Sequence, residues 1–195
     1  GQYEAALKDL DRAAELTQDD SVLWFCRGYV YARQSEHDKA IADLTKAVDL
    51  DPYYFEAYYH RAMAHCRKDD WEKALADYRK AIDAYVLPGQ ASYAAFQAAK
   101  VYELEFKWQE IIDLMDYYIQ EAGSEADLAQ AVYWKGRAQI ELDQVDAAVE
   151  AYLDVIESFG NDPEQGGVDV LVNNAGFGDM GAFDLGFMSL SSTRA

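Results

Sequence analysis

Apolar residues recur along most of the chain at the spacing of a helix, and the pattern itself repeats. In the opening segment 1–20, Tyr3, Ala6, Leu10 and Ala13 follow one another at helical intervals, which places them on one helical stripe. A shift of about 34 residues superimposes this segment on later ones. The superimposed sets are Asp9, Asp43 and Asp77; Ala6, Ala40 and Ala74; and Ala13, Ala47 and Ala81. Agreement at three registers indicates a genuine internal repeat.

Segment 21–54 is the best-formed repeat. Its pattern predicts one helix that buries Trp24, Gly28 and Tyr31, followed by a second helix with Ala40, Leu44 and Ala47 on its inner face. A small residue at 28 lets the two helices approach closely. Asp20 or Ser21 is predicted to cap the first helix, and Pro52 ends the unit because proline cannot continue a helix interior.

This unit resembles the tetratricopeptide repeat family. At the corresponding positions that family has a large aromatic, a small residue, an aromatic, Ala, a large apolar residue, Ala and Pro, matched here by Trp24, Gly28, Tyr31, Ala40, Leu44, Ala47 and Pro52. The resemblance implies an all-α fold, in which helix-turn-helix units stack into a right-handed superhelical array. It also implies a protein-binding scaffold rather than an enzyme.

The units predicted along the chain are a half repeat at 1–20, full repeats at 21–54 and 55–88, and looser repeats at about 92–123 and about 124–160. Beyond Gly89 the period lengthens by about three residues. Ile111 and Tyr118 stand where the family has alanine. These larger side chains predict that the helices of that pair sit further apart or tilt.

From Asn161 onward the helical pattern stops. The run VDVLV predicts a short strand, and residues 168–176, VDVLVNNAG, resemble the Asn-Asn-Ala-Gly segment of short-chain dehydrogenases. No Gly-rich phosphate-binding turn precedes this segment, and no Tyr-x-x-x-Lys pair follows it, so we expect no dehydrogenase activity. The 161–195 tail is either a foreign segment or a cap, whose apolar residues cover the last helix pair or lie in the groove of its own or a neighbouring molecule.

The net charge of −19 disfavours nucleic acid and anionic membrane surfaces as partners. No apolar run approaches the ~20 residues of a membrane span, and the opening residues lack a signal-peptide pattern. Two cysteines do not make a disulfide framework. The compartment stays open, with a lean to the cytoplasm.

The resemblance further implies that the first helix of each unit lines a concave binding face. The positions implied to point into it are Phe25, Tyr59, Phe96 and Tyr133; then Tyr29, Met63, Lys100 and Arg137; then Arg33 and Arg67. Aromatic side chains interleaved with cations suit an extended peptide that carries apolar side chains and some acidic groups. The alternative is that the aromatics pack between helices and the arginines pair with neighbouring acids.

One subset of the family holds a peptide carboxylate through a lysine, asparagine and arginine clamp. Here those positions hold Phe25, Tyr29, His60, Tyr93 and Gln97, so the clamp is absent. A Cys/His pair can be imagined around Cys26 and His60, but buried thiols and a packed histidine are the simpler interpretation. We expect no catalysis, no cofactor and no metal site. Self-assembly into a homo-oligomer is the alternative function.

Overall fold

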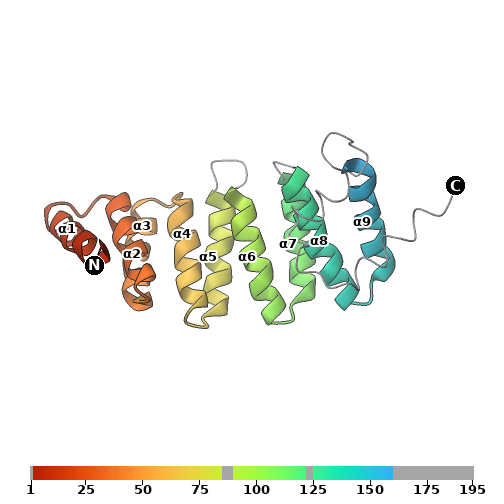
Figure 1. The fold of residues 1–195 in the computed structure, drawn as a ribbon, viewed down its shortest axis with the longest axis horizontal. Coiled ribbons are helices and arrows are strands. Elements are labelled where there is room, and N and C mark those ends of the chain that lie inside the picture. The colour runs from red at the N-terminus through yellow and green to blue at the C-terminus, as the bar shows by residue number, and fades with distance from the viewer. Residues whose placement is uncertain (1, 85–89, 122–124, 160–195) are drawn as a thin grey trace.

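The computed structural model describes residues 2–84, 90–121 and 125–159, and in these ranges the chain is a row of helices without strands. The helices are α1 (Gln2–Leu16), α2 (Ser21–Arg33), α3 (His37–Leu50), α4 (Phe55–Cys66), α5 (Trp71–Ala84), α6 (Gln90–Leu104), α7 (Trp108–Glu121), α8 (Glu125–Glu141) and α9 (Val145–Phe159). Figure 1 shows them in chain order from α1 at one end to α9 at the other. The predicted all-α array is confirmed. The strand predicted in the tail lies outside the described residues.

Each helix packs on the next helix in the chain, which gives the row its order. The helices form the pairs α2–α3, α4–α5, α6–α7 and α8–α9, and α1 packs on α2. The first helices of neighbouring pairs also touch, α2 on α4 and α6 on α8, whereas the second helices approach one another less. In a curved array the helices on the inner side are the crowded ones. The first helices therefore lie on the inner side.

The turn inside every pair has the same backbone design. One residue of each turn adopts a left-handed conformation, with φ between 57° and 62°: Ser35, Asp69, Phe106 and Asp143. The amide after it reaches back to a carbonyl in the last turn of the first helix, as in Glu36 to Tyr31 at 2.9 Å and Lys107 to Tyr102 at 2.9 Å. This bonding satisfies carbonyls that the helix end leaves free. The shared turn marks four equivalent helix pairs.

Small residues on the first helix face large ones on the second. A Cβ at Gly28 would lie 2.8 Å from Leu44 Cγ, so glycine is what allows α2 and α3 to pack this closely. A Cβ at Gly136 would lie 2.4 Å from Tyr152 Cζ in the α8–α9 pair. The equivalent positions in the middle pairs hold Ala62 with Tyr78 and Ala99 with Met115, all buried. Side-chain complementarity thus recurs in every pair.

Helices α6 and α7 contact each other less than α2 and α3 or α4 and α5 do, so the α6–α7 pair is the more open one. Ile111 and Tyr118 are fully buried in the core between them, at 0% and 2% exposure. The reduced contact agrees with the expectation that these larger side chains make the two helices sit further apart or tilt.

The N-terminal cap of α2 also follows the prediction. The Asp20 carboxylate accepts hydrogen bonds from the amides of Val22, at 2.9 Å, and Leu23, at 3.3 Å. Ser21, the alternative, is the first residue of the helix. Trp24 is 6% exposed and donates its indole N–H to the carbonyl of Gln18 at 2.8 Å, which fixes α2 against the preceding turn.

Candidate functional site

The most distinctive surface of the first helices is an aromatic patch formed by Phe25, Tyr29, Tyr54, Tyr59 and His60, which lie on or beside α2 and α4. The His60 ring is its centre: its centroid lies 5.0 Å from Tyr29, 5.4 Å from Tyr59 and 5.8 Å from Phe25. Phe25 also meets Tyr54 at 5.0 Å. Edge and tilted contacts at these separations are favourable, so the rings support one another across two helix pairs.

The aromatic patch packs against the core on one side and is exposed to solvent on the other. Tyr59 stacks on Phe55 with a centroid separation of 6.0 Å and meets the buried Tyr78 edge-on at 5.9 Å. Tyr29 of the patch, by contrast, is 36% exposed, and Met63 on α4 is 37% exposed. The surface therefore offers apolar area on a support that is already ordered, which reduces the entropy lost on binding.

Burial makes the patch electrically neutral around neutral pH. It lowers the pKa of His60, against the weaker opposing effect of Glu56, so the ring carries no charge at neutral pH. It also raises the pKa of Tyr54 to about 12, which keeps that hydroxyl protonated. An apolar or aromatic ligand side chain fits such a surface better than a charged one.

The predicted aromatic positions are not equivalent along the array. Phe25 and Tyr59 come together in the patch, but Phe96 is only 7% exposed and packs edge-on against Tyr118 at 5.7 Å in the core. Tyr133 is half-buried beside Trp134. On α6 the exposed aromatic is instead Tyr93, at 67%. For Phe96 the structure thus shows the inter-helix packing that the sequence left as an alternative.

The predicted cations also divide into two groups. Lys100 and Arg67 are exposed on α6 and at the end of α4. Arg33 is hydrogen-bonded to Tyr3 of α1, and this bond raises its pKa. Arg137 pairs with Glu103 of α6 and lies over the Trp134 ring at 5.7 Å. Arg137 therefore already has an acidic partner within the array.

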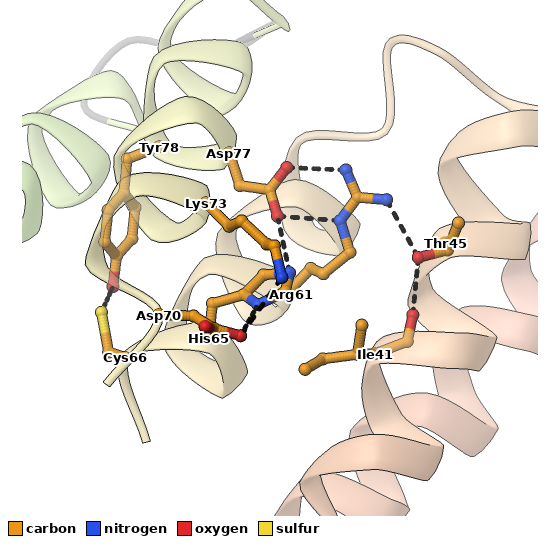
Figure 2. Close-up of polar contacts among 9 residues, drawn as sticks. All are labelled: Ile41, Thr45, Arg61, His65, Cys66, Asp70, Lys73, Asp77 and Tyr78. Atoms are coloured by element: carbon orange, nitrogen blue, oxygen red, sulfur yellow. Dashed lines mark hydrogen bonds and ion pairs between the residues drawn. The ribbon is translucent and has the colours of Figure 1, made fainter. Parts of the chain in front are cut away.

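Two further arginines, which the sequence did not single out, organise the array below this surface. Figure 2 shows that Arg61 donates two hydrogen bonds to the Asp77 carboxylate, from Nη2 to Oδ1 at 2.6 Å and from Nε to Oδ2 at 2.8 Å. Its Nη1 donates a third hydrogen bond to the Thr45 hydroxyl at 3.1 Å. One side chain of α4 thereby ties α3 to α5. Arg27 of α2 repeats the arrangement with Asp43 and Asp11, so we call these two sets the arginine clamps. A signal was present, because arginine and aspartate both recur at the repeat interval.

Two cysteine thiols and one buried histidine in the described residues bear on the question of catalytic chemistry. Burial raises the pKa of both the Cys26 and Cys66 thiols, which keeps them protonated and poorly nucleophilic. His65 is buried between Asp70, at 3.5 Å, and Asp77, at 4.0 Å, as Figure 2 shows. In the described part of the chain, no three His, Cys, Asp or Glu side chains come together to hold a metal ion. Within the same ranges, no helix has the length and apolarity that crossing a membrane requires.

Comparison of the fold with solved structures finds helical-repeat proteins that cover most of the chain. A crystal structure of MamA is 20% identical, with a TM-score of 0.64, over 80% of this chain and 87% of that one. YrrB is 21% identical, with a TM-score of 0.58, over 88% and 82%. BtubC from P. vanneervenii is 15% identical, with a TM-score of 0.60, over 80% and 72%. At these identities the likeness concerns the fold.

Comparison of the sequence adds the family. A search of curated protein sequences found no match. Models of the tetratricopeptide repeat match residues 21–54, 55–85 and 130–162, together about half of the chain. None of them reaches the segment 168–176, so the dehydrogenase resemblance has no support, and that segment lies outside the described residues. By its repeats and its helical array, the chain belongs to the tetratricopeptide repeat family.

Proposed function

We propose that the protein binds an extended peptide segment of a partner across its first helices, with an apolar or aromatic side chain seated on the aromatic patch. The repeat family and the fold support a protein–protein interaction scaffold. The observation that carries the finer proposal is the patch itself, which two adjacent helix pairs build together and which leaves Tyr29 and Met63 exposed. Tyrosine and methionine are common anchors of binding surfaces.

The cations near the patch indicate which other groups the ligand carries. Arg33 on α2, Arg67 on α4 and Lys100 on α6 lie on the first helices that carry or follow the patch. The chain as a whole has a net charge of −19, but these three cations can form ion pairs with acidic groups of a peptide. The ligand is therefore an extended segment with apolar anchors and flanking acidic residues. YrrB, whose fold is similar, is described as a TPR protein with an unusual peptide-binding site.

The test is selection of binders from a random peptide library, followed by titration calorimetry with the enriched peptides. Combining Tyr29→Ala in the patch with Met63→Ala on α4 removes exposed apolar area from the first helices while leaving the partly buried Tyr59 in place. We expect the affinity to fall by a factor of roughly ten or more, as for truncation of binding anchors. Leu153→Ala, at an exposed position on the second helix α9, is the control and should leave the affinity unchanged. Equal losses in both variants, or none in either, would contradict this assignment of the face.

A second candidate function is self-association through α1. This helix has no buried residue, and Leu16 at 82% and nearby Val22 at 54% are strongly exposed. Apolar side chains left exposed in this way favour association with another chain. Light scattering over a range of concentrations tests it: Leu16→Glu should shift a dimer towards monomer, and a wild-type chain that stays monomeric throughout would rule it out.

A further inference from the structure

A hollow of about 290 Å³ lies on the opposite set of helices, between α5 and α7. Its apolar lining comes from Ile82 of α5 and from Leu114 and Tyr117 of α7. Leu114 is half-buried and occupies the position that Asp77 holds in the α4–α5 pair. Ala98 likewise stands where the arginine of a clamp would be. The hollow thus lies beside the helix pair in which the clamp has been replaced by apolar side chains.

The polar part of the lining is predominantly acidic. Asp83, Glu110 and Asp113 contribute three carboxylates, and Arg79 is the cation among the lining residues. Arg79 is already engaged, because its Nη2 donates to the Tyr102 hydroxyl at 2.6 Å. The nearby Lys107 pairs with Glu105 at 2.7 Å. The carboxylate of Asp113 accepts a single neutral hydrogen bond from Gln109 at 2.9 Å. Three carboxylates against the one guanidinium of Arg79 give the lining a net charge of −2, and the charge of Lys107 acts on Glu110 from outside the lining.

We propose that this hollow binds a short segment of a partner protein in which one apolar side chain is flanked by lysine or arginine. The volume accommodates one side chain rather than a folded element. The flanking cations would meet Asp83, Glu110 and Asp113, where charge complementarity favours a basic segment and rejects an acidic one. The site takes ligands of opposite charge to those of the aromatic patch, and it uses second helices instead of first helices. A single array would then hold two different partner segments at once.

The test uses a fluorescently labelled peptide with the core sequence Lys-Lys-Leu-Lys-Lys and follows its anisotropy as the full chain is added. Two matched peptides separate the contributions: Glu-Glu-Leu-Glu-Glu reverses the charge, and Lys-Lys-Ser-Lys-Lys removes the apolar anchor. We expect binding of the first peptide, none of the second, and at least roughly tenfold weaker binding of the third, the factor that 1.4 kcal/mol represents.

The variant Glu110→Lys with Asp113→Lys should abolish most of this binding. Its control is Asp146→Lys with Glu150→Lys on α9, which changes the net charge equally at exposed sites outside the hollow. Equal losses in the two variants would show that the overall field attracts the peptide, and equal binding of the serine peptide would show that the hollow is not used. Either result overturns the proposal. Tyr29→Ala with Met63→Ala should leave this binding intact, so the two sites can fail independently.

Discussion

The two halves of the array hold their helices together by different means. In α2–α5, the arginine clamps join successive helices through bidentate pairs, Arg27 with Asp43 and Arg61 with Asp77, whose arginine side chains are each 16% exposed. In α6–α9, the equivalent positions hold Ala98 with Leu114, and Lys135 with Ala151. Lys135 pairs instead with Asp116 of α7, at 2.5 Å. The same fold is thus built once with directional charge pairs and once mainly with packing.

This difference teaches what each half can offer. A bidentate pair fixes the relative position of helices, because both partners have a defined direction. The clamped half carries the ordered aromatic patch on its first helices. The apolar half tolerates a wider helix spacing, and the hollow between α5 and α7 lies where the two designs meet. Substitutions in the clamps can show whether the clamps cause this contrast.

The largest effect is expected from breaking one clamp. Asp77→Ala leaves the Arg61 guanidinium buried without its partner, which should lower the free energy of unfolding by about 3–5 kcal/mol. Burial is the largest single effect on the pKa of Arg61 and lowers it, but the hydrogen bonds and the charge of Asp77, with smaller effects of Tyr58 and Asp49, together raise this pKa. Urea denaturation followed by circular dichroism measures the loss. Asp146→Ala, an exposed carboxylate on α9, is the control and should change little.

The same clamp can be replaced by the apolar pair that the α6–α7 pair has at the equivalent positions. Arg61→Ala combined with Asp77→Leu copies Ala98 and Leu114, and it should recover most of the stability that Asp77→Ala loses, because no charge remains buried. If the double variant is as unstable as the single one, the clamp is not interchangeable with packing. The contrast between the halves would then reflect a requirement of α4–α5 rather than a choice between two solutions.

Glycine-to-alanine substitutions should distinguish the two halves by a smaller difference in stability. In Gly28→Ala the new methyl group meets Leu44, which is 0% exposed, and the Ala40 carbonyl oxygen at 3.2 Å, so neither neighbour can move away. Overpacking of this kind costs about 1–3 kcal/mol, offset by roughly 1 kcal/mol of helix propensity. In Gly136→Ala the neighbour is the end of the half-exposed Tyr152 side chain. We expect Gly28→Ala to be the more destabilising in thermal denaturation. The opposite order would contradict the tighter packing of α2–α3.

Acid should weaken the clamped half through His65. Burial lowers the pKa of His65 below its ordinary 6.5, although Asp77 and Asp70 oppose this shift. As the pH falls, the unfolded chain binds a proton at this histidine before the folded chain does. The contribution of neutral His65 to the free energy of unfolding is therefore fully present above pH 6.5 and is lost as the pH falls below that value. The equivalent positions hold Tyr31 and Tyr102, so His65→Tyr should flatten the dependence of unfolding free energy on pH between 7 and 5.5.

His60 shifts in the same direction, and it provides the comparison for this experiment. His60→Phe removes the titration in the aromatic patch but keeps the one beneath the clamp. If the pH dependence is unchanged in His65→Tyr and disappears in His60→Phe, the acid sensitivity belongs to the surface and not to the clamped core.

Local patterns in the sequence were enough to predict the helices, the Asp20 cap and the small residue at 28. These features depend on residues within one helix pair, whose spacing is visible along the chain. The repeat interval also placed Phe25 and Tyr59 on equivalent faces, which the structure brings together at His60.

What the sequence missed depends on side-chain contacts between different helices. Arg61 reaches Thr45 in the preceding pair and Asp77 in its own, and helical periodicity alone does not join such distant positions. Phe96 was placed at the same register as Phe25, yet the more open α6–α7 pair draws it into the core against Tyr118. The longer period beyond Gly89 indicated a change in helix packing. It did not indicate which side chains would fill the space between the helices.

The smallest effect concerns the turns, where the halves differ by one residue. Ser35 and Asp69 are small polar residues in the left-handed conformation, whereas Phe106 holds it at φ 57° with a bulky side chain that is 77% exposed. Left-handed backbone costs a residue with a Cβ about 1 kcal/mol, and glycine avoids this cost. Phe106→Gly should therefore stabilise the array by about 0.5–1 kcal/mol, less the edge contact with Trp108, and raise the urea midpoint. Asp69→Gly should gain less, because aspartate tolerates this conformation. A destabilised Phe106→Gly variant would mean that the ring contact with Trp108 outweighs the backbone strain, and that the α6–α7 turn is held by packing like the helices it joins.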